Sequence, residues 1–190
     1  MVVSSLAANA AVIDLTVGTP AQSSTLSSFT ANLALDTVNN FTHTVSSDAD
    51  ATWQVLLPSS FSFDEVVAAG RQSCCQTRFR DITIEIVNFT GDVNTDFTGG
   101  IVTFASALLN PENADGNIPL TVNPGGAVGN MIRISRTPDP DLSGSGGAGN
   151  QDEANVLSID TVTAQGTLIP EPSTGVFGLI GLFLMGRRRR

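Results

Sequence analysis

Short apolar or alternating segments, separated by Gly, Pro, Asn and Asp, run through the chain from about residue 11 to residue 166. The segment 81–87 alternates most cleanly, with Ile82, Ile84 and Ile86 on one face. Segments of this length with turn residues between them predict an all-β fold, an antiparallel jelly-roll β-sandwich. The predicted strands are 12–17, 53–57, 62–68, 81–87, 101–107, 118–122, 131–135 and 156–162, and 31–35 is expected to form one helical turn.

The body of the chain is strongly acidic. Lysine is absent, and four of the nine arginines are the last four residues, which leaves five arginines against 18 acidic residues, a balance near −13 (5 − 18). Nucleic-acid binding needs clustered cations that displace counterions, so no nucleic-acid partner is expected. The single histidine has no serine or cysteine motif around it, so no hydrolytic triad and no enzyme activity are expected.

The stretch 70–81 concentrates unusual chemistry. It contains both cysteines of the chain, the adjacent Cys74 and Cys75, and three arginines, among them Arg71 and Arg78. A disulfide between neighbours closes almost no loop and therefore contributes little unfolded-state entropy. It would instead form a small rigid apolar plate beside fixed cations, as in the floor of a ligand site. The alternative is two small buried thiols beside surface arginines.

Several segments resemble the discoidin, or galactose-binding-like, jelly roll over roughly residues 12–164. They are 18–25, 31–36, 53–55, 132–135 and 157–159. The Arg-x-x-Cys-Cys-x-x-Arg spacing is similar to that of the fucose-binding F-type lectins. This resemblance implies that His43, Arg71 and Arg78 hydrogen-bond sugar hydroxyls, while a Cys74–Cys75 vicinal disulfide packs on the sugar ring. His43 lies 28 positions before Arg71 (71 − 43), about where that family places its histidine.

The sequence departs from the lectin pattern in two places. Ser73 stands where the family has an acidic residue, so Arg71 is expected to lose its orienting carboxylate, and the interval from His43 to Arg71 is one residue longer than usual. The family's calcium loop is also altered, with Thr37 in place of a turn glycine and Thr161 in place of an acid. One structural calcium ion is expected at most, with ligands drawn from Asp36, Asn39, Asn40 and Asp160.

The N-terminal residues 1–10 suggest the end of a signal peptide. Ala8, Asn9 and Ala10 fit the small-x-small cleavage pattern, although the basic start and long apolar run of a full signal are missing. An ordinary alanine-rich terminus is the alternative.

The C-terminal residues 167–190 carry a more specific pattern. Pro170, Glu171 and Pro172 precede an apolar run and then the cluster Arg187, Arg188, Arg189 and Arg190. As a helix the apolar run rises only roughly 20 Å, short of the ~30 Å hydrocarbon core, and the arginines act as a stop-transfer cluster. This order resembles the PEP-CTERM sorting signal. It implies export, transient membrane anchoring by a short hydrophobic helix, and an exosortase-type membrane peptidase as a partner.

Two formal motif matches lack their required context. The glycines at 144, 146 and 149 match a dinucleotide fingerprint, but no strand precedes them and no helix follows, so a flexible loop is expected. Residues 92–96 resemble the start of an EF-hand loop. Phe97 stands in the glycine position and Thr103 in the glutamate position, so a solvated turn is expected there.

The sequence thus predicts an exported carbohydrate-binding domain over 11–166, recognising fucose or a related sugar at the cell surface or in an exopolysaccharide matrix. The alternative is a matrix protein that keeps the jelly-roll scaffold and the export tail but has lost sugar binding. A weaker alternative is an accessory domain that directs an enzyme partner to polysaccharide.

Overall fold

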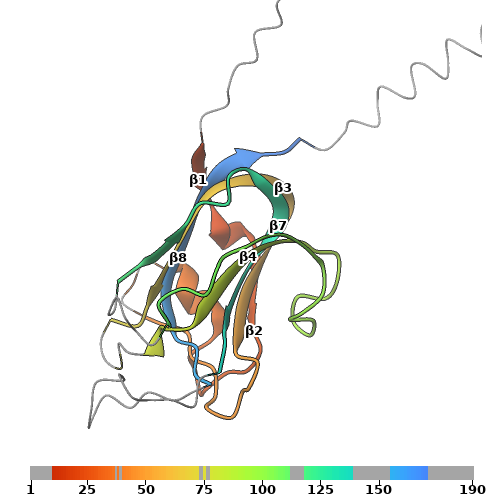
Figure 1. Cartoon of the computed structure of the whole chain (residues 1–190). Helices are drawn as coiled ribbons and strands as arrows, with labels where there is room; N and C mark the ends of the chain where they lie inside the picture. The colour runs from red at the N-terminus through yellow and green to blue at the C-terminus, as the bar shows by residue number, and fades with distance from the viewer. Residues whose placement is uncertain are drawn as a thin grey trace, which may run out of the picture.

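The structure, a computed structural model, describes residues 10–36, 38, 40–72, 75, 78–111, 118–138 and 155–170. Within these ranges the protein is an antiparallel β-sandwich without α-helices (Figure 1). The strands are β1 (Ala11–Ile13), β2 (Thr19–Gln22), β3 (Thr52–Gly70), β4 (Ile82–Asn88), β5 (Ile101–Ala105), β6 (Leu120–Val122), β7 (Ala127–Arg136) and β8 (Ile159–Leu168). Two 3-10 turns, η1 (Leu15–Val17) and η2 (Ala31–Leu35), pack beside them.

Strand β3 joins the two layers of the sandwich. Its first half pairs with β2 and β7, and its second half pairs with β8 and β6. The register with β7 shifts between Leu56 and Phe61, a break that contains Pro58. Proline cannot donate to a β-ladder, so it favours such an irregularity. One layer is therefore β2–β3–β7–β4–β5 and the other is β1–β8–β3–β6.

The main core lies between these layers. Trp53 and Ile134 project from the first layer and Phe63 and Val66 from the second, and all four are fully buried. The Trp53 indole Nε1 donates to the carbonyl oxygen of Ala31 at 2.8 Å. This bond fixes η2 against the core, because a buried indole N–H needs an acceptor.

A second, smaller core covers part of the outer face of the first layer. Val87 and Met131 of the sheet pack there against Phe89 and Val93 of the loop that follows β4. Gln54 Nε2 ties this loop to the sheet by donating to the carbonyl oxygens of Val93 (2.7 Å) and Asp96 (2.9 Å).

The all-β antiparallel fold predicted from the sequence is confirmed, and several of its strands have other bounds. The expected strand 131–135 is part of β7, which begins at Ala127, and the expected strand 118–122 begins at Leu120. The expected strand 12–17 ends at Ile13, and 15–17 turns as η1 because Asp14 Oδ1 accepts from the backbone N–H of Thr16. The expected strands 53–57 and 62–68 are one continuous β3. The last strand begins at Ile159 and continues to Leu168, later than the predicted 156–162. The helical turn at 31–35 is confirmed as η2.

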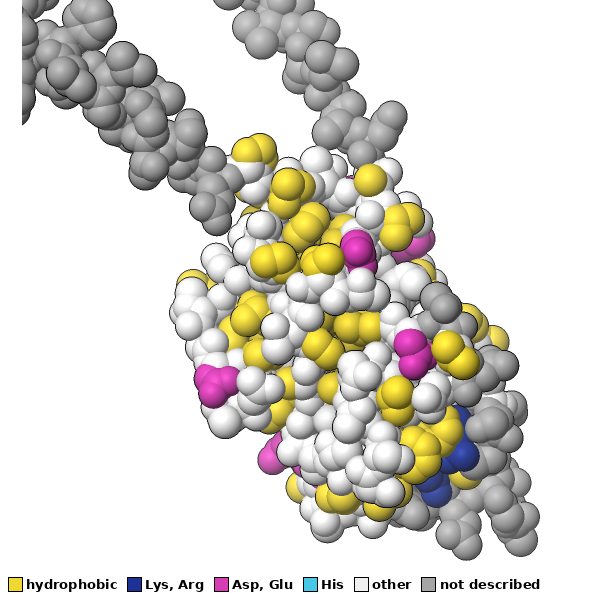
Figure 2. All heavy atoms as spheres, turned by 180° about the vertical axis from the view of Figure 1, so that it is seen from behind, with side chains coloured by type: hydrophobic (Ala, Val, Ile, Leu, Met, Phe, Trp, Pro, Cys, Tyr) yellow, Lys and Arg dark blue, Asp and Glu magenta, His cyan; other side chains and the backbone are white. Residues whose placement is uncertain are grey.

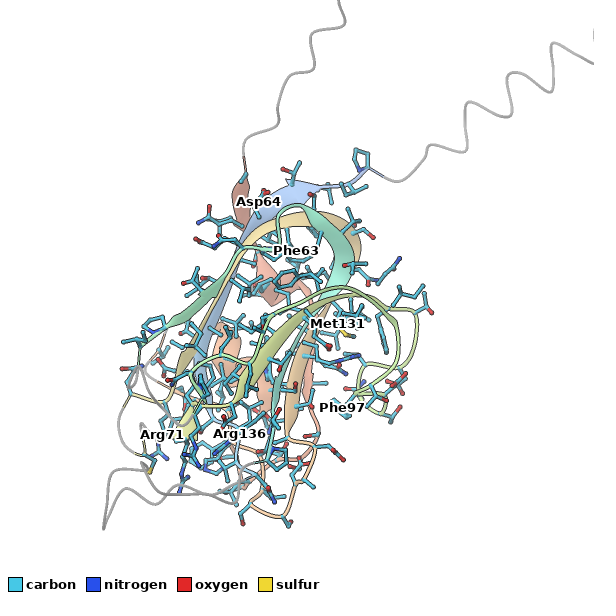
Figure 3. The ribbon with its side chains drawn as sticks, viewed as in Figure 1. Phe63, Asp64, Arg71, Phe97, Met131 and Arg136 are labelled. Atoms are coloured by element: carbon cyan, nitrogen blue, oxygen red, sulfur yellow. The ribbon has the colours of Figure 1, made fainter. Side chains whose placement is uncertain are left out.

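The two ends of the described chain lie at the same end of the sandwich, where β1 pairs with the second half of β8 (Figure 1). Along β8, Ile159 pairs with Gly70 and Leu168 with Phe61, so the strand separates this end from the Arg71 end by roughly 30 Å. Figure 3 accordingly places Phe63 and Asp64 at one end, and Arg71 and Arg136 at the other. Within the described ranges, no helix has the length and apolar character that crossing a bilayer requires.

Candidate functional site

The segment around His43 is extended and held from both sides. The backbone N–H groups of Thr42 and Thr44 donate to the carbonyl oxygens of Ile159 (2.8 Å) and Leu157 (3.1 Å). On the other side the His43 N–H donates to the carbonyl oxygen of Phe29 at 3.1 Å. Alternate residues of an extended segment share a face, so Phe41 and His43 project together while the threonines face β8.

His43 and Arg78, predicted as sugar-binding residues, are brought into direct contact. His43 Nε2 lies 3.1 Å from Arg78 Nη1, and His43 Nδ1 contacts the carbonyl oxygen of Thr44. A carbonyl only accepts, so Nδ1 carries the proton and Nε2 accepts from the guanidinium. Both side chains are buried, with 5 % of His43 and 8 % of Arg78 exposed. The imidazole therefore orients Arg78 in this structure.

Arg71 is oriented by an aromatic ring. Its guanidinium carbon lies 3.8 Å from the centroid of the Phe41 ring, and Phe41 in turn stacks on Phe29 with a centroid separation of 4.6 Å. A guanidinium over a phenyl face is a cation–π contact. Burial, and then the nearby charge of Arg78, lower the pKa of Arg71 from its usual value. The absence of an acid at position 73 thus leaves Arg71 with the ring of Phe41 as a support.

Cys75 lies in the turn that leads to Arg78, whose N–H donates to the Cys75 carbonyl oxygen at 3.1 Å. Cys75 is disulfide-bonded and has a φ of 56°, a left-handed conformation that residues other than glycine seldom adopt. Such conformations concentrate at functional sites. Cys74 and Ser73 lie outside the described residues, so the vicinal pairing stays a prediction.

Two of the predicted calcium ligands lie near one another. Burial, and then the negative charge of Asp36, raise the pKa of Asp160 above its usual value. Asp36 Oδ1 accepts from the N–H of Val38 at 3.2 Å, and Asn40 Oδ1 accepts from the N–H of Phe41 at 3.2 Å. Asn39 lies outside the described residues. Among the described residues, no three His, Cys, Asp or Glu side chains form a metal-binding group.

The remaining motifs divide between the described and undescribed parts of the chain. Residues 92–99 form the expected turn, in which Asp92 Oδ1 accepts from the N–H of Asn94 at 2.9 Å and Asp96 Oδ1 from the N–H of Gly99 at 2.7 Å. The glycine-rich loop 144–149 lies outside the described residues. Of the sorting signal only Pro170 is described, and Glu171, Pro172 and Arg187 to Arg190 are not.

The sequence reasoning missed three residues of this site. Phe41 and Phe29 supply the aromatic support, and Gln22 Nε2 donates to the carbonyl oxygens of Phe29 (3.0 Å) and His43 (3.3 Å). Phe41 precedes His43 by two positions, so the period of an extended segment was an available signal. The parts played by Phe29 and Gln22 depend on contacts that no local spacing indicates.

Comparison with known proteins matches the fold only. No protein-family model matches the chain, and no curated protein matches its sequence. Solved structures do match: a fucose-binding module, SpX-3, from Streptococcus pneumoniae has a TM-score of 0.57 at 17 % identity, over 80 % of this chain and 96 % of that one. The chain has the galactose-binding-like fold.

Two further neighbours extend the comparison. The family 32 carbohydrate-binding module of NanJ from C. perfringens, solved with galactose, has a TM-score of 0.59 at 17 % identity, over 83 % of this chain and 99 % of that one. A fucolectin from striped bass (Morone saxatilis) serum has a TM-score of 0.58 at 17 % identity. That match covers 82 % of this chain and 49 % of the fucolectin.

Proposed function

We propose that this protein is a carbohydrate-binding, lectin-like module that recognises fucose or a related sugar through Arg71 and Arg78. The observation that carries the proposal is the pair of oriented guanidinium groups, one bonded to His43 and the other stacked on Phe41. Arginine offers several donors in a rigid fork and so matches neighbouring sugar hydroxyls. Structural neighbours that bind fucose or galactose support the choice of ligand.

The residues around the arginines take complementary roles. His43 orients the guanidinium of Arg78 and does not itself donate to the sugar, because its Nε2 lone pair already accepts from Arg78. Cys75 with Cys74 forms the proposed vicinal ring, an apolar plate for the C–H face of the sugar. The protein acts by binding and not as an enzyme.

A calcium ion between Asp36 and Asp160 is part of the proposal. Burial, and then the negative charge of Asp36, raise the pKa of Asp160, and oxygen ligands are those that calcium prefers. A cation there would relieve the repulsion and fix the loop that leads to Phe41. Its chemistry would be structural, with no role in contacting the sugar.

The geometry of the chain ends favours display at a surface. β8 ends at the pole of the sandwich opposite Arg71, so a C-terminal anchor would direct the sugar site away from the membrane. We therefore propose export, transient anchoring through residues 174–185 and recognition of the tail by an exosortase-type peptidase. The proposed location is the cell surface or the exopolysaccharide matrix.

A glycan array tests the proposal. The full chain, oxidised and kept in a detergent without a sugar head group, is screened with and without calcium. Binding confined to fucosylated or closely related glycans supports the lectin. A blank array from folded protein would favour the alternative, a matrix protein that keeps only the scaffold, with Ser73 as the departure responsible.

A further inference from the structure

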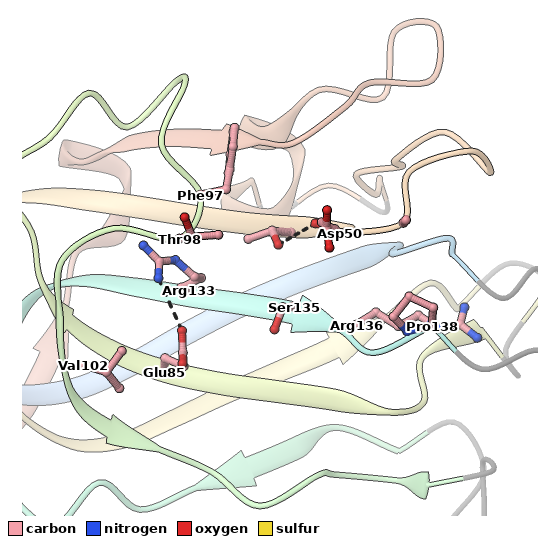
Figure 4. Close-up of a pocket in the computed structure, with 11 residues that line it drawn as sticks. Asp50, Glu85, Phe97, Thr98, Val102, Arg133, Ser135, Arg136 and Pro138 are labelled. Carbon is pink, nitrogen blue, oxygen red and sulfur yellow. Dashed lines mark hydrogen bonds and ion pairs between the residues drawn. The ribbon is translucent and has the colours of Figure 1, made fainter.

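A second hollow lies on the outer face of the first layer, and neither Arg71 nor Arg78 lines it. It encloses roughly 340 Å³, within the range of small-ligand pockets (Figure 4). Its floor is Thr52 of β3, Glu85 of β4 and the β7 residues Arg133 and Ser135. Its walls come from Asp50 before β3, from Phe97 and Thr98 of the loop after β4, and from Val102 and Pro138.

Arg133 shapes this hollow. Its Nη2 donates to the carbonyl oxygen of Gly99 (2.7 Å), its Nε donates to Gln54 Oε1 (3.1 Å), and its Nη1 lies 3.5 Å from Glu85 Oε2. Only 4 % of Arg133 is exposed. The loop that forms one wall is thus bonded to the floor, so the hollow is formed before any ligand arrives, which lowers the entropic cost of binding.

The charges of the hollow balance one another. Arg133 is compensated by Glu85, and Asp50 stands at the opposite rim with Arg136, whose Nη1 donates to the carbonyl oxygen of Val156 at 2.7 Å. Two arginines and two carboxylates line the hollow, so it offers an anionic ligand no net positive charge, in a protein that is strongly acidic as a whole. The hydroxyls of Ser135 and Thr98 and the carboxylate of Glu85 instead offer donors and acceptors to a neutral ligand.

The hollow also has apolar surface. Phe97, which is half-buried against the small outer core, shares the lining with Val102 and Pro138. A compact group of hydroxyls beside an apolar wall matches a sugar, which has hydroxyls on its edge and C–H groups on its face.

Figure 2, which shows the molecule from behind, has its arginine side chains gathered at one end and its acidic side chains scattered singly.

We propose that this hollow is a second saccharide-binding site, specific for neutral sugar units. None of His43, Arg71 and Arg78 lines the hollow, although Arg136, which does, lies at the same end of the sandwich as Arg71, so each site can take its own ligand or its own unit of one polymer. One module would then hold two polysaccharide segments at once, and binding at one site would raise the effective concentration of the polymer at the other. The inference does not rest on the Arg71 site, because none of the lining residues belongs to that site.

Amide chemical-shift mapping of the full chain, in a detergent without a sugar head group, tests this site. The probes are methyl β-D-glucoside, methyl β-D-galactoside and methyl α-L-fucoside, with D-glucuronate as an anionic comparator. We expect a neutral glycoside to shift the amide signals of Glu85, Thr98 and Ser135, with millimolar affinity and no comparable effect of glucuronate. Ser135→Ala should weaken binding about 2- to 10-fold through loss of one hydroxyl. Ser135→Leu, which fills the floor, should abolish it.

The two sites are separated by their variants. Arg78→Ala should leave the shifts at Glu85, Thr98 and Ser135 intact. Glu85→Gln keeps the shape of the side chain and should weaken binding of the neutral glycoside at the hollow. This variant decides the test if Ser135→Leu lowers the melting temperature of the protein. The inference is overturned if no neutral glycoside shifts these signals at about 100 mM. The inference is also overturned if glucuronate shifts these amide signals more than the neutral glycosides do. It is overturned as well if the glycoside-induced shifts vanish in Arg78→Ala and persist in Ser135→Leu.

Discussion

The contact between Arg71 and Phe41 gives the most specific prediction for the sugar site. The substitution Phe41→Leu removes the ring face that lies 3.8 Å from the Arg71 guanidinium and keeps an apolar side chain of similar bulk. A cation–π contact contributes about 0.5–2 kcal/mol, with the upper value for a desolvated pair. Because Arg71 is half-buried, we expect methyl α-L-fucoside binding to weaken about 2- to 30-fold.

A titration calorimeter, or a chemical-shift titration where affinity is millimolar, measures this effect. Phe61→Leu is the matched control, because Phe61 is also half-buried and pairs with Phe63 (ring centroids 6.2 Å apart) at the opposite end of the sandwich. The control should lower the melting temperature by a similar amount and leave the dissociation constant unchanged.

A double-mutant cycle isolates the contact itself. In an Arg71→Ala background, Phe41→Leu should have little further effect, since the partner of the ring is already gone. Equal weakening by Phe41→Leu in both backgrounds would refute the reasoning. An unchanged dissociation constant in the single variant would refute it as well.

Four further predictions concern the surroundings of the site. His43→Phe keeps an aromatic ring but removes the acceptor of Arg78, so fucoside binding should fall at least about tenfold in the same titration. In thermal unfolding, about 1 mM calcium should raise the melting temperature by roughly 3–6 °C if the site has the ~0.1 mM affinity of extracellular modules, and Asp160→Asn should abolish the rise. Without calcium, the pKa of Asp160 is higher in the folded than in the unfolded state, so protonation of Asp160 stabilises the folded state. The free energy of unfolding should therefore rise as pH falls through the folded pKa of Asp160, and Asp160→Asn should remove this rise. Gly70→Ala would place a Cβ 2.3 Å from the Cβ of Phe79, and chemical denaturation should show a loss of stability of about 1–3 kcal/mol.

The fold was readable because its strands alternate. Ile82, Ile84 and Ile86 appear in the sequence as one face, and all three are fully buried in β4. The bend in β3 was not readable, since two apolar runs with a proline between them look the same whether the strand ends or bends. The start of β8 was misplaced because residues before Ile159 are apolar and buried but bond to the extended segment at 42–44 instead of to β3.

The candidate site combines residues that the sequence suggested with three that it did not, Phe29, Phe41 and Gln22. His43, Arg71 and Arg78 were suggested by the resemblance to the F-type lectins, and the structure joins His43 to Arg78 and places Arg71 on Phe41. The loss of an acid at position 73 suggested an unsupported Arg71. Phe41 supports it from a segment some thirty positions away in the chain, and long-range packing of that kind leaves no local pattern to detect.

The most direct test of the central claim is a titration of methyl α-L-fucoside into the folded, oxidised full chain and into its Arg78→Ala and Arg78→Lys variants. The account predicts saturable binding by the native protein and a loss of about 10- to 150-fold in Arg78→Ala, the magnitude of a charged hydrogen bond. Arg78→Lys should not restore it, because an ammonium group lacks the planar fork. No saturable binding at tens of millimolar, or equal binding by Arg78→Ala, would contradict the account.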